Sequence, residues 1–247
     1  MSDEEPRLDE QALAQIAEVG IASQLDSTEK LEVNIQSDLS QISQGKVDFV
    51  SVIGEGLVVK QDIRVQEFEL QARGIAVDWL KAVFGDIKLE QPASAAVRAV
   101  MQEADLNRAI NSDFIRRKFP VFPLQLEGRL IKIQLKQIVL QLCPNNRIVC
   151  HGDVLLQDCE KLQDLRFTAS LRSRTDKQPI LLEGFSCKNS DAISLEIAYA
   201  FVKKAREFST AQYWELEGIK FKIEKMVVRE REIEIEVTAY ISQLPSF

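Results

Sequence analysis

The sequence is poor in the residue types that usually carry chemistry. Its 247 residues include one histidine, His151, and four cysteines, Cys143, Cys150, Cys159 and Cys187. The cysteine spacing matches no zinc signature, and free cysteines most often behave as small buried hydrophobic residues. A metal site around Cys150 and His151 is therefore the less favoured interpretation. No serine or aspartate near His151 has the spacing of a catalytic triad, so we expect a non-enzymatic protein without metal or cofactor.

Long hydrophobic runs are also missing. No segment approaches the roughly 18 to 20 apolar residues that a membrane-spanning helix requires. The first six residues, MSDEEP, have neither the basic start nor the apolar stretch of a secretory signal peptide. These absences predict a cytoplasmic protein, with contact at a membrane surface as the remaining option.

Positive charge is not concentrated anywhere. The chain has 38 acidic and 31 basic residues and a net charge of -7. Residues 1–44 hold 10 acidic and 2 basic residues, which leaves 28 acidic and 29 basic residues in 45–247. Nucleic-acid binding depends on a concentrated basic surface that displaces counterions. We therefore expect no nucleic-acid partner.

Most of the chain alternates apolar and polar residues, as β-strands with one buried face do. The clearest case is the hairpin predicted over residues 214–241, with a charged turn at 229–232. Residues 131–140 repeat the pattern of 219–228 without a gap, including a loss of phase after the sixth residue. Such a slip predicts a β-bulge, and the repetition predicts one large, bent antiparallel sheet. An earlier strand should stop at a turn or bulge at Gly54-Glu55-Gly56, which lacks the Lys-Ser/Thr of a phosphate loop.

Three stretches have the spacing of amphipathic helices. They are 9–25, with apolar residues Leu13, Ile16, Ala17, Ile21 and Leu25, then 103–118, and 190–209. A shorter helix is expected over 79–85. We expect the first helix to pack on the sheet. A mobile acidic lid or a membrane-surface helix is less favoured, because its polar face has almost none of the Lys and Arg typical of helices that bind anionic lipid.

Several longer motifs carry a family resemblance. They are GEGL at 54–57, RVQEFEL at 64–70, GIAV at 74–77, FGDIKLEQP at 84–92, EADLNRAINS at 103–112 and WELEG at 214–218. In these motifs the chain resembles the LmeA-like phospholipid-binding family of bacteria over nearly its whole length after about residue 40. The resemblance implies an elongated α+β fold in which a long curved antiparallel sheet wraps amphipathic helices, as in tubular lipid-binding proteins. It brings no active-site signature, and the envelope roles of exported relatives do not carry over.

These observations predict an acidic helical segment at 1–27 and a single α+β lipid-binding-like domain at 28–247. The leading hypothesis is non-catalytic binding, or transfer, of a phospholipid or another long apolar molecule between the sheet and the helices. The alternative is a protein-interaction or scaffold module with a filled core, in which the same stripes are ordinary core residues. The candidate ligand-binding residues are Leu106, Ile110, Phe114, Ile197, Phe201 and Phe208, and the candidate head-group residues are Arg116, Arg117 and Lys118.

Overall fold

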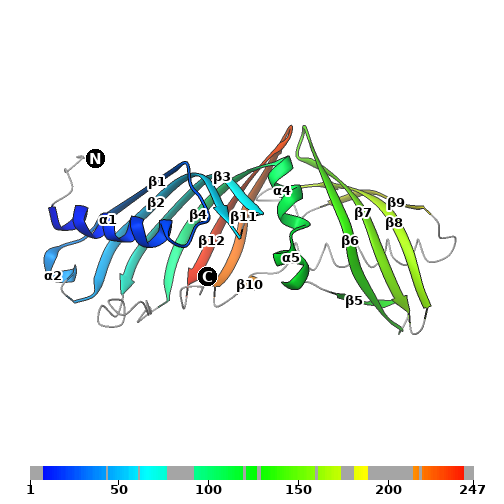
Figure 1. Ribbon diagram of the computed structural model, residues 1–247, viewed down its shortest axis with the longest axis horizontal. Helices are drawn as coiled ribbons and strands as arrows, with labels where there is room; N and C mark the ends of the chain where they lie inside the picture. Colours follow the sequence, from blue (N-terminus) through cyan, green and yellow to red (C-terminus); the bar gives the residue numbers. More distant parts are fainter. Residues whose placement is uncertain are drawn as a thin grey trace.

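The computed structural model shows an elongated molecule made of two antiparallel sheets that follow one another along its long axis (Figure 1). Neither sheet closes on itself. The predicted helices at 79–85 and 190–209 both lie outside the described residues. The structure describes residues 8–42, 44–60, 62–76, 92–118, 121–126, 129–158, 161–173, 181–188, 214–216 and 219–241.

The first sheet has seven strands in the order β1-β2-β3-β4-β12-β11-β10. Its two halves come from opposite ends of the chain, and they join where β4 pairs with β12. Two helices, α1 (Leu8–Ala22) and the short α2 (Leu39–Ile42), precede or interrupt the first strands. The strands are β1 (Lys30–Gln36), β2 (Lys46–Val59), β3 (Ile63–Ala76), β4 (Ala93–Gln102), β10 (Trp214–Leu216), β11 (Ile219–Arg229) and β12 (Glu232–Ile241).

One face of this sheet is apolar from β1 to β11. Cross-strand pairing aligns apolar side chains in continuous rows, because every second residue of a strand points to the same side. The central row runs through Val33, Val52, Leu70, Val97, Val237 and Ile223. Helix α1 covers the β1 end of this face, where Leu13, Ala17 and Ile21 pack on Val33 and Val52. The expected packing of the first helix is confirmed, except that Ile16 is 70% exposed and faces away from the sheet.

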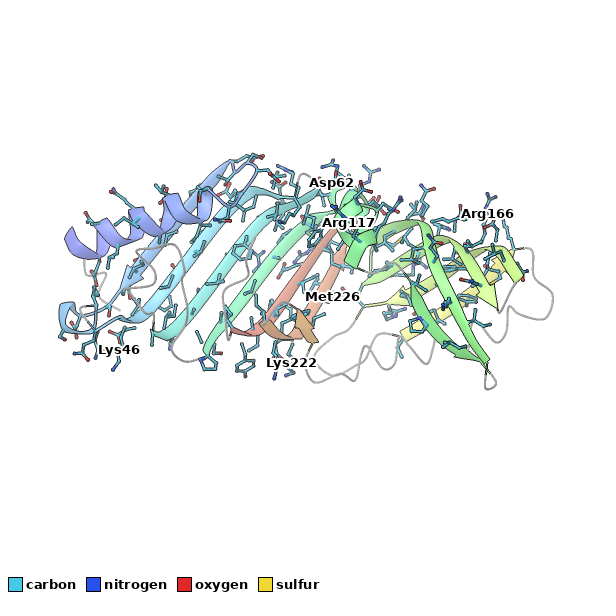
Figure 2. All side chains as sticks on the ribbon, turned by 60° about the horizontal axis from the view of Figure 1, so that its bottom comes forward. Lys46, Asp62, Arg117, Arg166, Lys222 and Met226 are labelled. Atoms are coloured by element: carbon cyan, nitrogen blue, oxygen red, sulfur yellow. The ribbon has the colours of Figure 1, made fainter. Side chains whose placement is uncertain are left out.

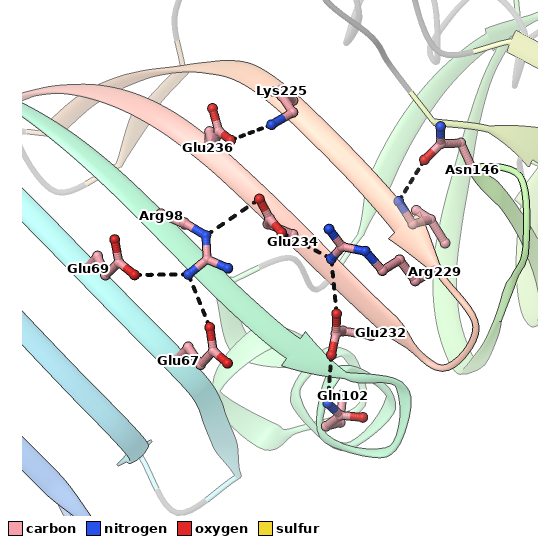
Figure 3. Close-up of polar contacts among 11 residues, drawn as sticks. Glu67, Glu69, Arg98, Gln102, Asn146, Lys225, Arg229, Glu232, Glu234 and Glu236 are labelled. Atoms are coloured by element: carbon pink, nitrogen blue, oxygen red, sulfur yellow. Dashed lines mark hydrogen bonds and ion pairs between the residues drawn. The ribbon is translucent and has the colours of Figure 1, made fainter.

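The opposite face of the same sheet is charged. Figure 3 shows Arg98 of β4 among three carboxylates, with its guanidinium nitrogens 3.1 Å from Glu67, 3.0 Å from Glu69 and 3.5 Å from Glu234. Arg229 reaches the other oxygen of Glu234 at 3.0 Å. The ion pairs run across four strands and meet at Glu234, which is only 8% exposed, so this face carries a charged network in the middle of the sheet.

The strand expected to stop at Gly54-Glu55-Gly56 does not stop. β2 continues through the glycines to Val59 and stays paired with β3 on both sides of them. The local irregularity is confined to Gly56, whose φ of +59° is a left-handed value that favours glycine. A Cβ atom on Gly56 would lie 2.4 Å from the side chain of Glu29. Glycine is therefore favoured there both by the backbone conformation and by the close approach of Glu29.

The second sheet has five strands in the order β5-β6-β7-β8-β9. Its inner face holds the largest buried cluster, centred on Val154 and Leu165, which are each 1% exposed. Gly152 lets the ring of Phe167 lie flat over its backbone, because a Cβ there would be 2.3 Å from the ring. The strands are β5 (Phe122–Leu126), β6 (Arg129–Cys143), β7 (Arg147–Asp158), β8 (Lys161–Arg172) and β9 (Leu181–Lys188).

The predicted repeat of two bulged hairpins is confirmed residue by residue. The β6–β7 register shifts between Leu135 and Gln137, and the β11–β12 register shifts between Ile223 and Lys225. The sixth residue of each copy, Lys136 or Glu224, is therefore the extra residue of a bulge. The prediction of one large sheet is wrong, however. The two hairpins belong to different sheets and approach each other at their turns (Figure 1), because the periodicity of a strand does not identify its neighbours.

Candidate functional site

The two sheets are joined where the turns of their repeated hairpins meet. In the β6–β7 turn, Asn145 and Asn146 both have left-handed backbones, with φ of 63° and 59°, which asparagine tolerates better than most residues. The side-chain oxygen of Asn146 accepts a hydrogen bond from Val228 N at 2.9 Å (Figure 3). In the other turn, Arg231 N donates to Leu142 O at 3.2 Å. Each turn therefore uses backbone groups that the neighbouring sheet leaves unpaired.

An apolar cluster fills the joint behind these bonds. Leu142 of β6, Val228 of β11 and Ile233 of β12 are 3 to 4% exposed and pack together. Leu106, from the helix α4 (Glu103–Ile110), packs against them. Leu106 was predicted to line a ligand site, and in the structure it packs against the apolar cluster at the joint between the two sheets.

Helix α4 occupies the edge of β6 in place of another strand. Beyond Ile133, β6 has no partner in β5. There the amide of Asn107 donates to Leu140 O at 2.8 Å and accepts from Leu140 N at 2.7 Å. Asn111 does the same with Ile138, at 2.6 Å and 3.0 Å. Each asparagine amide thus supplies the donor and the acceptor that a neighbouring strand would supply.

The Asn ladder, which we define as Asn107 and Asn111 with their β6 partners, follows from the dimensions of the two elements. Four residues of an α-helix rise about 6 Å, and two residues of a strand rise about 6.8 Å. Side chains at i and i+4 of the helix therefore match successive exposed backbone groups of the strand. Glu103, four residues before Asn107, extends the ladder, because its carboxylate accepts from Leu142 N at 2.6 Å.

The single helix predicted over 103–118 is two helices. α4 ends at Ile110, and α5 (Asp113–Lys118) begins after a break at Asn111 and Ser112. The hydroxyl of Ser112 accepts a hydrogen bond from Ile115 N at 3.3 Å, so Ser112 caps the second helix. The break redirects the chain, and Arg116 then donates to Lys136 O at the bulge of β6, at 3.0 Å.

A groove of about 370 Å³ opens between α4, α5 and the bulged part of β6. This volume is at the lower end of the roughly 300 to 1,000 Å³ typical of ligand sites. Side chains of a regular strand alternate between its two faces. The bulge instead places three consecutive residues of β6, Gln134, Leu135 and Lys136, in the lining of the groove. The lining consists of four apolar residues, Ile110, Ile115, Leu135 and Ile138, and four polar ones, Asn111, Arg116, Gln134 and Lys136.

The groove brings together two of the predicted site residues from different sets. Ile110 comes from the predicted apolar lining and Arg116 from the predicted head-group cluster. Phe114 and Arg117 are not part of the lining, and Arg117 is exposed at the surface (Figure 2). The side chain of Lys118 and the predicted residues Ile197, Phe201 and Phe208 lie outside the described residues. Their contact with a ligand stays a prediction.

Four further lining residues were not predicted from the sequence: Asn111, Gln134, Leu135 and Lys136. A signal for them was present. The loss of phase in β6 marked Lys136 as the bulged residue, and bulges often occur beside functional sites. The spacing of Asn107 and Asn111 was a second signal, which looks the same in sequence as a polar, solvent-facing stripe.

Lys136 also faces a carboxylate, since its amine contacts Asp164 of β8. Arg116 forms no ion pair with a carboxylate among the residues that the structure describes. An arginine without an acidic partner at the mouth of a groove retains N–H donors for an anionic ligand. The groove therefore combines an apolar wall with one accessible positive charge.

Three further observations concern metal binding, thiol reactivity and membrane spanning. The described ranges contain no group of three His, Cys, Asp or Glu side chains that would hold a metal ion. Burial raises the pKa of the Cys150 thiol to about 11, which disfavours the reactive thiolate. None of the helices that the structure describes is both long and apolar enough to cross a bilayer.

Comparison with known proteins identifies the family. The sequence profile of the LmeA-like phospholipid-binding family matches residues 7–238, which is nearly the whole chain. The protein therefore belongs to this family, as its motifs predicted. No curated protein and no solved structure matches the sequence.

Proposed function

We propose that this protein binds a phospholipid non-covalently and catalyses no reaction. The acyl part would lie along the apolar side of the groove, on Ile110 and Ile115, and the phosphate would lie near Arg116. The observation that carries the proposal is the presence of Ile110 and Arg116 in one groove of about 370 Å³, in a chain of a phospholipid-binding family.

The size of the groove suggests how the ligand would sit. At about 370 Å³ the groove holds a head group with the first part of an acyl chain better than it holds a complete phospholipid. The rest of the lipid would extend from the groove along the molecule or remain in a membrane. Peripheral contact with a membrane and transfer of the lipid are the corresponding extensions of the proposal.

The adjacent residues Arg116 and Arg117 provide a matched test. Both are exposed cations in α5, but only Arg116 lines the groove. We expect Arg116→Gln to weaken binding of an anionic phospholipid about tenfold, through loss of a charge-assisted hydrogen bond. Arg117→Gln removes the same charge and should leave binding unchanged. Native mass spectrometry of purified protein mixed with phosphatidylglycerol measures both.

Equal effects of the two substitutions would contradict the assignment of Arg116 to the head group. A wild-type protein that yields no lipid on solvent extraction and binds none on addition would contradict the proposed function itself. That result would favour the second candidate, a protein-interaction module with a filled core. The well-packed joint of Leu106, Leu142, Val228 and Ile233 is the feature that supports this alternative.

A further inference from the structure

A small polar pocket lies on the outer face of the second sheet, away from the groove. It is an open depression of about 170 Å³ between β7, β8 and β9, and it shares no lining residue with the groove. Figure 2 shows the pocket residue Arg166 near the opposite end of the molecule from Lys46. The polar side chains of its lining are His151, Asp153, Arg166, Thr168, Ser186 and Lys188.

These six side chains form two adjacent rows across the strands. Asp153 is opposite Arg166, which is opposite Lys188. In the next row His151 is opposite Thr168, which is opposite Ser186. Residues two apart along a strand share a face, so both rows project to the same side of the sheet.

The first row contains a charge arrangement that an isolated sheet would avoid. Arg166 and Lys188 are direct cross-strand neighbours, and like charges in that position repel. Asp153 balances only one of them, with its oxygen 3.2 Å from Arg166 Nε. Lys188 forms no ion pair with any carboxylate in the described residues. The row therefore keeps an excess positive charge at the pocket.

A second cross-strand pair of cations on the same face also has one carboxylate partner. Arg147 and Arg172 are also opposite each other on β7 and β8. There, Glu183 lies 2.5 Å from Arg172 Nη2. Each pair thus has one cation with a carboxylate partner, and the pair at Arg166 and Lys188 differs in having the polar side chains of the second row beside it in the pocket.

The second row and the floor supply hydrogen bonding and a fixed shape. His151 Nδ1 lies 3.0 Å from Thr168 Oγ1, and the Ser186 hydroxyl is next to Thr168 across the strands. Between the polar rows the floor is the backbone of Gly152 and Phe167, and behind it, on the inner face, the Phe167 ring stacks on the Phe185 ring with centroids 5.7 Å apart. Two hydroxyls, an imidazole and two cations over a packed floor are groups that bind tetrahedral oxyanions.

We propose that this pocket binds a phosphate group, carried either by a lipid head group or by a soluble phosphate. Arg166 and Lys188 supply the charge, and Thr168 and Ser186 donate hydrogen bonds. A volume of about 170 Å³ suits one such anion and is below the usual range for larger ligands. The proposal goes beyond the lipid groove and does not depend on acyl-chain binding.

The test measures binding of inorganic phosphate to the full chain by isothermal titration at low ionic strength. The double variant R166Q/K188Q should bind phosphate at least about tenfold more weakly than wild type, because each lost cation removes a charge-assisted hydrogen bond. The control K132Q/R147Q removes the same charge from the same face outside the pocket, and it should bind as wild type does. D153N should bind severalfold more tightly, because it removes the carboxylate that competes for Arg166.

Flotation with phosphatidylcholine vesicles, with and without phosphatidic acid, distinguishes the two sources of phosphate. A head-group site predicts that only vesicles with phosphatidic acid bind, and that R166Q/K188Q reduces their binding. A soluble-phosphate site predicts that R166Q/K188Q binds vesicles as wild type does but loses the heat of titration with inorganic phosphate. The proposal is overturned if wild type binds neither probe, if the control loses as much affinity as R166Q/K188Q, or if D153N binds phosphate more weakly. The comparison of R166Q/K188Q with its control tests this pocket separately from the groove, because none of the substituted residues lines the groove.

Discussion

The Asn ladder should be one of the main attachments between the two sheets. Asn107→Ala removes two hydrogen bonds to Leu140, of 2.7 and 2.8 Å, and leaves the Leu140 N–H and C=O without their partner. At about 0.5 to 1.5 kcal/mol per net hydrogen bond, the loss is about 1 to 3 kcal/mol. Alanine is the better helix former by about 0.6 kcal/mol, which offsets part of this loss. We therefore expect a net destabilisation of about 1 to 2 kcal/mol for N107A.

The same reasoning applies to Asn111→Ala, which removes two bonds to Ile138. Urea unfolding followed by circular dichroism measures each variant and the double variant N107A/N111A. Because both asparagines hold one helix against one strand, the double variant should deviate from the sum of the single ones. Hydrogen exchange of the Leu140 and Ile138 amides should accelerate in the variants while the β2 and β3 amides stay protected.

Arg108→Ala is the control on the same helix. Arg108 is 51% exposed and pairs with the buried Asp105 at 3.2 Å; because Asp105 keeps Arg64 as a second partner at 3.4 Å, R108A should cost at most about 1 kcal/mol. If N107A and N111A each changed the free energy of unfolding by less than R108A, the ladder would not be holding the helix to β6. Unchanged exchange at Leu140 in N107A would lead to the same conclusion.

Three further predictions concern single side chains. Burial alone would raise the pKa of Glu234, but Arg229 and Arg98 outweigh it and lower that pKa below the ordinary 4.5. Glu234 thus stabilises the fold above pH 4.5, and this stabilisation is lost as the pH falls through its lowered pKa. E234Q should therefore reduce the fall in the free energy of unfolding at acidic pH. The same pH dependence in E234Q and wild type would refute this role of Glu234. With its pKa of about 11, Cys150 should react with iodoacetamide at pH 8 about a hundredfold more slowly than an unperturbed thiol. Mass-spectrometric mapping measures this rate, and alkylation of Cys150 at the rate of an exposed thiol would contradict the prediction. Gly152→Ala should destabilise by about 1 to 3 kcal/mol in thermal unfolding, because its Cβ would overlap the Phe167 ring, whereas Gly20→Ala, with open space around it, should not destabilise.

The local structure of the β-rich part was predictable from sequence. Alternation identified the strands, and the loss of phase located both bulges at Lys136 and Glu224, because a bulge changes which residues share a face. The pairing of the strands was not predictable in this way. β4 pairs with β12 across about 130 residues of chain, and alternation states which face is apolar but not which strand comes next.

The site was predictable only in part. The apolar spacing of the helix identified Ile110, and the basic end of the helix identified Arg116. The roles of Asn107 and Asn111 were hidden, because an asparagine that replaces a strand has the same sequence pattern as one that faces water. The helix break at Ser112 could not be predicted either, since a break that is stabilised by one hydroxyl leaves the apolar spacing of the sequence intact.

The central claim is that lipid occupies the groove where α4 and α5 meet the bulge of β6. Photolabelling tests it most directly, with a phospholipid that carries a diazirine on its acyl chain, followed by peptide mapping of the crosslinked protein. If lipid lies there, labelled residues fall within 110–116 and 134–138, and labelling is reduced in R116Q but not in R117Q. Crosslinks confined to other segments, or none above a denatured control, would contradict it.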